Sequence, residues 1–231
     1  MEIILEKIKC LNGFELKIIA LITMTIDHMG AVLLPQYGFL RIIGRIAFPI
    51  YCFLLVEGYY HTKDIKKYIL RLFLFAVVSE IFFDMTFYGK IMYKNHQNVF
   101  LTLVIGLITI ALIDLVCSFY YKKNKFIMVV LMFIILISGG MLAEILRTDY
   151  SIFGVLIIFG FYIFKNNYFG QILYQWYING VVLGETQLYA LMALPFIFLY
   201  NGKAGKYKWK WFFYTYYPLH LVGLYMINRF I

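Results

Sequence analysis

The chain has 231 residues, of which 63% are hydrophobic, 20% are aromatic and only 14% are charged. A soluble domain of this size has no room to bury that much apolar surface, and disordered chains have the opposite composition. These numbers exclude both classes and predict a polytopic membrane protein that forms a single domain over residues 1–231. The formal net charge of +9 does not indicate nucleic-acid binding, because basic residues commonly flank membrane spans.

Apolar stretches of roughly 20 residues, the length that crosses a bilayer, predict an all-α bundle of about nine transmembrane helices. The predicted spans are 15–34, 39–60, 66–86, 98–120, 126–143, 150–164, 168–183, 185–200 and 211–230. Asn12, with Glu15 three residues later, predicts a capping box at the start of the first span.

Most of the 21 Lys and Arg residues fall in alternate connections between these spans, including 63–67, 122–125 and 203–210. Basic loops face the cytoplasm in membrane proteins, so the N-terminus is predicted to lie inside and the C-terminus outside. The predicted location is therefore the cytoplasmic membrane, crossed many times.

The first predicted span contains Asp27 and His28, and a charge in the hydrocarbon core costs at least about 2.5–3.5 kcal/mol. Such residues are candidates for function by default. Neighbours on a helix point about 100° apart, so the two side chains are expected to face different partners. His28 titrates near neutral pH and is the candidate general base or nucleophile.

Two pairs of charged residues lie four residues apart, at Arg41 and Arg45 and at Glu80 and Asp84. Residues with this spacing share one helix face. The arginines are predicted either to pair with the carboxylates across helices, or to line a polar cavity around His28 together with them. The two readings are compatible.

Two further polar residues stand out. Glu57 near the end of the second span is a candidate gating or packing residue, and His220 follows Pro218 in the middle of the last span. The four histidines are too scattered to predict a metal site, and the cysteines have no metal-binding spacing.

Several strings, spread in order over about residues 12–225, together resemble the TraX family of conjugal-transfer proteins, typified by the F-pilin acetylase. They include Asn12-Gly13-Phe14, Ile26-Asp27-His28-Met29-Gly30, Ile43-Gly44-Arg45-Ile46-Ala47-Phe48-Pro49, Ser79-Glu80 with Asp84, and Tyr217-Pro218-Leu219-His220.

This resemblance implies an integral membrane acyltransferase that uses cytoplasmic acetyl-CoA and, in the typical member, acetylates the N-terminal amine of pilin. The acceptor here is an unknown extracytoplasmic amine or hydroxyl, and no metal is expected. The residues predicted to be catalytic are His28, Asp27, Arg45, Glu80, Asp84 and His220, and those predicted to bind substrate are Arg41 and Glu57.

His28 is expected to take the acceptor proton or to carry the acetyl group briefly, and Asp27 to orient a histidine. Arg45 is expected to stabilise the oxyanion or to position donor phosphates. Two other readings stay open. The same buried groups suit a small proton-coupled transporter or channel, and the chain also suits a non-catalytic assembly factor.

Overall fold

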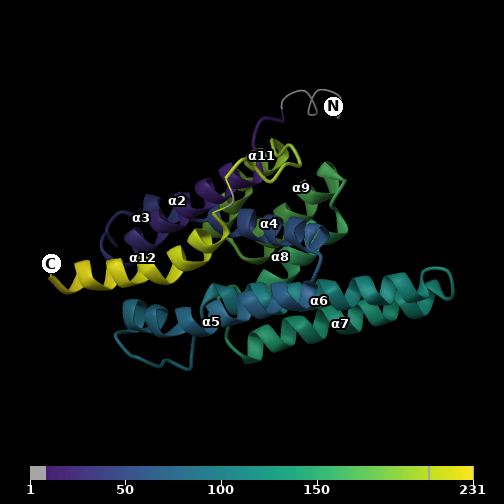
Figure 1. Ribbon diagram of the computed structural model, residues 1–231, viewed down its shortest axis with the longest axis horizontal. Coiled ribbons are helices and arrows are strands. Elements are labelled where there is room, and N and C mark those ends of the chain that lie inside the picture. Colours follow the sequence, from purple (N-terminus) through teal and green to yellow (C-terminus); the bar gives the residue numbers. More distant parts are fainter. Residues whose placement is uncertain (1–8, 208, 231) are drawn as a thin grey trace.

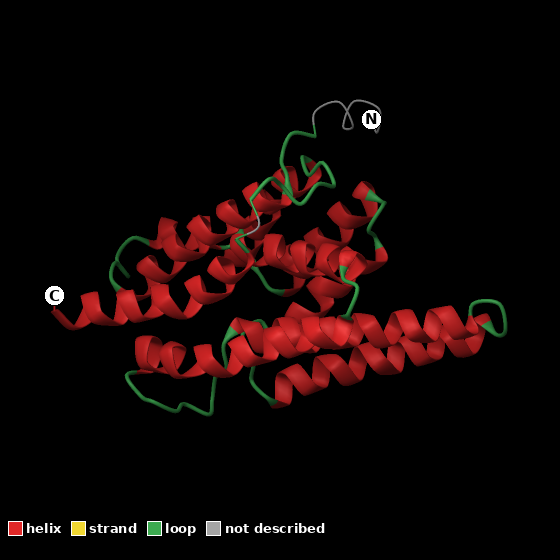
Figure 2. Cartoon of the chain, in the orientation of Figure 1, coloured by secondary structure: helices red, strands yellow, loops and turns green. Residues whose placement is uncertain are grey.

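A computed structural model describes residues 9–207 and 209–230 and shows an all-helical protein, with no β-strand in that part of the chain (Figures 1 and 2). The helices are α2 (Gly13–Val32), α3 (Gly38–Gly44), α4 (Ala47–His61), α5 (Ile65–Tyr88), α6 (Val99–Tyr120), α7 (Lys125–Ile145), α8 (Ser151–Ile163), α9 (Tyr168–Trp176), α10 (Glu185–Leu188), α11 (Ala193–Phe198) and α12 (Lys210–Phe230). The all-α prediction is therefore confirmed.

The start of α2 has the predicted capping box. The Asn12 side chain accepts hydrogen bonds from the backbone N–H groups of Phe14 and Glu15, at 3.0 and 3.1 Å. The Glu15 carboxylate in turn accepts from the Asn12 N–H at 2.8 Å. The reciprocal bonds satisfy three backbone N–H groups at this helix end.

The predicted number of spans is wrong when judged by length and apolarity. Three helices in the described residues are long and apolar enough to cross a membrane, at Gly38–His61 (α3 and α4 together), Val99–Tyr120 and Lys125–Ile145. Helices α2, α5 and α12 are as long, at 20, 24 and 21 residues, but several charged or polar side chains lower their hydropathy.

The predicted spans 168–183 and 185–200 are not regular α-helices. Helix α9 passes into a π-helix at Tyr177–Val182, and α10 continues through a 3₁₀ segment at Tyr189–Met192 into α11. Gly184, at φ +90°, interrupts the helical backbone between the two stretches.

The connections gather at two ends of the bundle. At one end Leu11 bridges to Tyr200, and Lys165 pairs with Glu57 at 3.3 Å. At the other, the Gln97 N–H donates to the Arg147 carbonyl at 2.9 Å. We call the first the basic end, with loops 62–64, 121–124, 165–167 and 199–207, and the second the opposite end, with loops 33–37, 89–98 and 146–150 (Figure 1).

The buried core joins helices that are far apart in the sequence. Leu16, Ile50, Leu107, Ile157 and Leu221 are each 0% exposed, and they come from α2, α4, α6, α8 and α12. This packing fixes α2 beside α12, with both helices running from the basic end toward the opposite end (Figure 1).

Candidate functional site

A half-buried ion-pair cluster joins α2 to α3 near the opposite end. The Asp27 carboxylate pairs with Arg41 through one oxygen and with Arg45 through the other, the latter at 3.2 Å. Arg41 also donates to the Asp27 backbone carbonyl at 3.1 Å. A Cβ at Gly44 would collide with the Asp27 carboxylate, so glycine is what lets the helices approach this closely.

Arg45 also forms hydrogen bonds to Gln187 of α10 and to Tyr150, the residue before α8. Its guanidinium donates to the Gln187 amide oxygen at 3.3 Å and to the Tyr150 hydroxyl at 3.5 Å. Gln187 donates to Asn179 at 3.3 Å, and Asn179 donates to the Gln175 side chain at 3.0 Å. A chain of buried amides therefore links the π-helix to the ion-pair cluster.

Sequence reasoning did not single out these amides. Gln171, Gln175 and Asn179 lie four residues apart in an apolar stretch, and each is at most 2% exposed. That repeat is the signal that predicts a polar face turned inward.

The second feature is a pair of histidines from α2 and α12. His28 Nδ1 lies 2.7 Å from His220 Nε2, and the two rings stack with an interplanar angle of 15°. His220 Nδ1 lies 3.1 Å from the Tyr216 carbonyl oxygen. We call these two residues the histidine dyad.

The hydrogen-bond network assigns the tautomers of the dyad. A carbonyl oxygen only accepts, so His220 Nδ1 carries the hydrogen and, in the neutral ring, Nε2 offers a lone pair. His28 then donates from Nδ1, which leaves the lone pair of its own Nε2 free for another proton.

The dyad sits among aromatic side chains. The His28 ring centroid lies 5.3 Å from that of Phe87 and 6.1 Å from that of Tyr217, and Tyr216 stacks on His220 at 5.4 Å. The Tyr216 hydroxyl bonds to Thr25 at 2.9 Å, which ties α12 to α2 beside the dyad.

Asp27 and His28 face different partners, as their helical spacing predicts. Asp27 turns to the two arginines and His28 turns to His220. The expectation that Asp27 orients a histidine is therefore wrong for the described structure. The Asp27 carboxylate instead forms ion pairs with the two guanidinium groups at α3, the helix that follows α2.

The expected pairing of the arginines with Glu80 and Asp84 is also wrong. Glu80 accepts from the Asn98 N–H at 3.0 Å and from its side chain, and Asp84 accepts from the Tyr93 N–H at 2.6 Å. These two carboxylates bond the connection from α5 to α6. The arginines pair with Asp27 instead, because the short turn between α2 and α3 holds them next to it.

Glu57 lies apart from the other predicted site residues. It is at the basic end, where it pairs with Lys165 at 3.3 Å and lies 3.9 Å from His61. The described residues contain no group of three or more His, Cys, Asp or Glu side chains placed to hold a metal ion.

His96 is a loop histidine at the opposite end. Its ring lies 2.5 Å from the Tyr88 hydroxyl and 3.6 Å from the Asp149 carboxylate. The nearby Asp149 carboxylate raises the pKa of His96 above its usual range, and burial opposes this effect.

Comparison with known proteins gives the family. The model of the TraX protein family matches residues 13–228. The chain is 27% identical to the "Probable fimbrial assembly protein FimC, serogroup H1" of Dichelobacter nodosus, over 92% of this chain and 94% of that protein. It is also 33% identical to an uncharacterized protein of Rickettsia prowazekii (strain Madrid E), over 48% of this chain and 37% of that protein.

No solved structure is similar to the chain. The family match extends over all the helices described above and includes both the ion-pair cluster and the histidine dyad. The chain belongs to the TraX family.

Proposed function

We propose that this protein is an integral membrane acetyltransferase that moves an acetyl group from acetyl-CoA to an amine or hydroxyl acceptor. The observation that carries the proposal is the histidine dyad, which presents a free lone pair on His28 Nε2. A histidine oriented by a second hydrogen-bonded group is the arrangement that general-base catalysis of acyl transfer requires.

In the proposed reaction the neutral acceptor attacks the carbonyl carbon of the thioester. His28 Nε2 takes the proton that the acceptor nitrogen or oxygen loses, while His220 Nε2 accepts the hydrogen bond from His28 Nδ1–H and so stabilises the resulting imidazolium. The tetrahedral intermediate then breaks its C–S bond. The departing CoA sulfur takes the proton from His28, which returns to its neutral form.

The ion-pair cluster is proposed to serve the oxyanion of that intermediate. Arg41 has the more exposed side chain of the two arginines, at 37% against 17% for Arg45. Arg41 is therefore the proposed oxyanion donor, Arg45 and Asp27 hold it in place, and Glu80 and Asp84 support the neighbouring wall.

The membrane is proposed to be the cytoplasmic membrane, with the basic end inside. Lysines and arginines concentrate at that end, which supports a topology with the start of α2 in the cytoplasm and the end of α12 outside. The short α8 is proposed to lie within the bundle, and the irregular segments around α9 and α11 are proposed to cover one side of it, with exposed apolar side chains such as Phe169 and Trp176 facing lipid.

The acceptor is proposed to be a subunit of a fimbrial or pilus assembly, reached from the opposite end. The similarity to the protein named as a probable fimbrial assembly protein supports this class of acceptor. A protein amino terminus presents an amine of the required kind.

The test measures CoA release and transfer of labelled acetyl from acetyl-CoA by purified protein in nanodiscs, with and without envelope extract. His28→Ala is expected to lower the rate about 10²–10⁴-fold, the usual contribution of a general base. His220→Asn is expected to lower kcat and shift its pH profile while KM for acetyl-CoA stays the same.

His96→Ala is the matched control, because His96 lies outside the dyad. A folded His28→Ala protein that keeps full activity would contradict the assignment. Solute flux in proteoliposomes without acetyl-CoA, lost in the same variant, would favour the transporter reading instead.

A further inference from the structure

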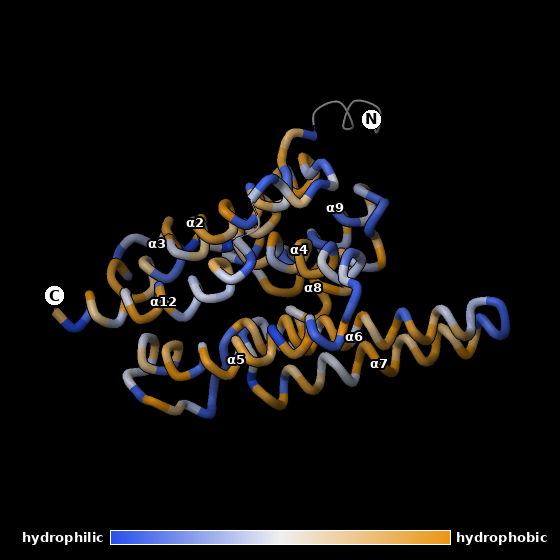
Figure 3. The backbone as a smooth tube through the Cα atoms, viewed as in Figure 1, coloured by the Kyte–Doolittle hydropathy of each residue, from blue (hydrophilic) through white to orange (hydrophobic). Residues whose placement is uncertain are grey.

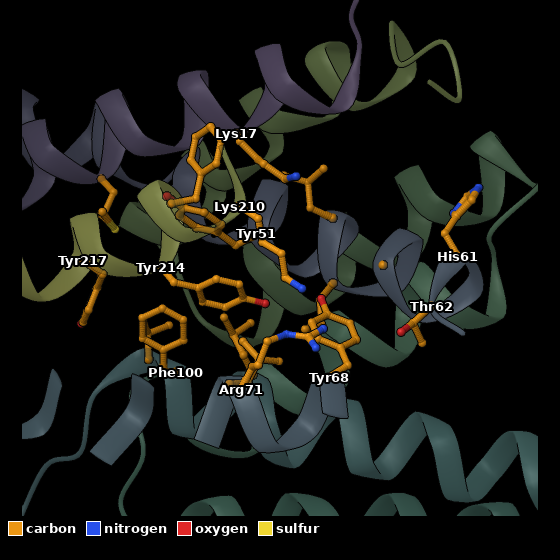
Figure 4. A pocket seen from close by; sticks show the side chains of 18 residues that line it. Lys17, Tyr51, His61, Thr62, Tyr68, Arg71, Phe100, Lys210, Tyr214 and Tyr217 are labelled. Atoms are coloured by element: carbon orange, nitrogen blue, oxygen red, sulfur yellow. The ribbon is translucent and has the colours of Figure 1, made fainter. Parts of the chain in front are cut away.

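A cavity of about 360 Å³ lies between α2, α4, α5, α6 and α12 (Figure 4). Its volume falls within the range of sites for small molecules and cofactors, roughly 300–1,000 Å³. The lining combines three cationic side chains with aromatic and aliphatic ones. The cations are Lys17 on α2, Arg71 on α5 and Lys210 on α12.

The positive charge of this cavity is not balanced from within. No Asp or Glu lines it, and none of the three cations forms an ion pair with a carboxylate among the described residues. Lys210 and Arg71 are close enough for their like charges to repel, and Arg71 Nε is buried without a hydrogen-bond partner. Lys17 and Arg71 are half-buried and Lys210 is exposed. Three cations gathered around one cavity, with no carboxylate in its lining, attract an anion.

Hydroxyl groups converge on the same point. Figure 4 shows Arg71 and Lys210 pointing toward one another, with the hydroxyls of Tyr68 and Tyr214 beside them. Arg71 also lies over the Tyr68 ring at 5.6 Å. A guanidinium, an ammonium and hydroxyl donors around one space are the groups that bind a phosphate. The preference for basic loops in the cytoplasm explains lysines in loops but not this inward convergence.

The cavity leads from these cations toward the histidine dyad. Lys17 and His28 are eleven residues apart on α2, or about 16 Å along the helix axis, and Met24 between them lines the cavity. Lys210 and His220 are ten residues apart on α12, or about 15 Å, and Tyr217 lies between them. Tyr217 lines the cavity on one side, and its ring is 5.3 Å from that of His220 on the other.

We propose that this cavity binds a molecule whose phosphate lies between Lys17, Arg71 and Lys210 and whose extended arm lies along Tyr51 and Tyr217 toward the dyad. This inference rests on the proposed function and deepens it, since the molecule is then the acyl donor. CoA carries its sulfur at the end of a long arm beyond its phosphates, which matches the separation between the cations and the histidines. An anionic phospholipid has similar chemistry, a phosphate next to an apolar chain.

Binding measurements distinguish CoA from an anionic phospholipid as the molecule in the cavity. Purified protein is placed in phosphatidylcholine nanodiscs, and binding of CoA, dephospho-CoA and pantetheine is measured by calorimetry at low and high salt. CoA is expected to bind, to weaken as salt increases, and to lose at least about tenfold in affinity when its phosphates are removed, as in pantetheine. The same measurement in nanodiscs that also contain phosphatidylglycerol tests competition by a lipid.

Lys17→Gln, Arg71→Gln and Lys210→Gln are each expected to weaken CoA binding about tenfold, because each removes one charged partner of the phosphate. Lys122→Gln is the matched control, since Lys122 is an exposed lysine at the same end of the bundle but in the α6–α7 loop. It is expected to bind CoA as the unchanged protein does. A change of equal size in all four variants would overturn the proposal.

The cavity assignment and the acetyltransferase proposal are contradicted by different results. His28→Ala is expected to bind CoA with unchanged affinity while losing acetyl transfer. If transfer requires His28 but the cavity variants bind CoA normally, the cavity assignment fails and the acetyltransferase stands. If CoA binds through the cations but no transfer occurs, the acetyltransferase fails. If phosphatidylglycerol displaces CoA at trace amounts or binds in its place, the cavity is a lipid site and the donor assignment is overturned.

Discussion

Two regions of this bundle differ in the side chains that they place inside the protein and on its surface. The hairpin of α6 and α7 is mostly apolar (Figure 3). The surface of α7 includes large exposed apolar side chains such as Phe133 and Ile137. The region formed by α2, α3 and α12 instead buries the ion-pair cluster and the histidine dyad. We call these the hairpin region and the polar region.

The two regions also pack by different means. In the hairpin region, Gly139 of α7 meets Thr109 of α6, and close contact through small residues holds membrane helices together without charge. In the polar region, charged side chains from α2 and α3 satisfy one another. The comparison teaches that α2 and α12, which carry the histidine dyad, fall short of the hydropathy of a span because they contain polar side chains that pair with each other inside the bundle.

The largest difference is expected when a half-buried carboxylate is neutralised in each region. Asp27→Asn leaves the half-buried Arg45 and the more exposed Arg41 without their counter-charge and is expected to cost about 2–3 kcal/mol of unfolding free energy. The matched change in the hairpin region is Asp114→Asn, where the carboxylate accepts from the Tyr59 and Tyr162 hydroxyls at 2.8 Å each. An amide still bonds to hydroxyls, so the expected cost is only about 1 kcal/mol.

Equilibrium unfolding in mixed detergent micelles measures both variants of this pair. Equal losses for the two would show that Asp27 is stabilised by hydrogen bonds alone, and the contrast between the regions would then disappear.

A smaller effect is expected from adding one methyl group at a glycine. The added Cβ of Gly44→Ala meets the Asp27 carboxylate, and forcing it in is expected to cost about 1–3 kcal/mol and to lower acetyl transfer as Arg41 moves away. Gly223→Ala in α12 is the control, because nothing lies within 4 Å of its added Cβ. Alanine is the better helix former there, so stability is expected to be unchanged or slightly higher.

Thermal unfolding and the transfer assay together measure this second pair. A Gly44→Ala protein as stable and as active as Gly223→Ala would mean that α2 and α3 need no close approach for the site to work.

The same contrast explains what the sequence predicts and what it does not. Local features follow directly from the residues, as the Asn12 cap and the separate facing of Asp27 and His28 demonstrate. The partners of the charged side chains do not follow from the residues alone, because Asp27, Glu80 and Asp84 are chemically alike. Only the tertiary packing decides which of the three carboxylates pairs with Arg45. The meeting of His28 with His220, 192 residues away, is set by the packing of α2 on α12.

The number of spans was mispredicted for a related reason. A count of apolar residues treats Gln175 and Asn179 as tolerated interruptions of a span, whereas in the fold they form a buried hydrogen bond that links α9 to the π-helix. Local pattern carries no information on whether an amide in an apolar stretch finds a partner. The converging cations of the cavity went unpredicted too, since Lys17, Arg71 and Lys210 are distant in sequence and come from three helices.

The smallest expected effect lies at the opposite end, where His96 faces Asp149 outside the membrane-spanning helices. Because Asp149 raises the pKa of His96 in the folded protein above the unfolded value near 6.5, the protonated ring stabilises the fold. This stabilisation is complete below that unfolded value and is lost as the pH rises through the folded value. Both side chains are about one-third exposed, at 37% and 35%, so the effect is expected to stay below about 1 kcal/mol.

Unfolding of the unchanged protein and of His96→Asn, compared from acidic to alkaline pH, measures this contribution. The two stabilities are expected to differ most at acidic pH and to converge at alkaline pH. Thr109, in the hairpin region, bonds to the carbonyl of Ile105 without an ionisable partner, so Thr109→Val is expected to change stability by the same amount at every pH. A His96→Asn difference that grows with pH would reverse the sign and show that the neutral ring is the stabilising form, held by Tyr88 rather than by Asp149.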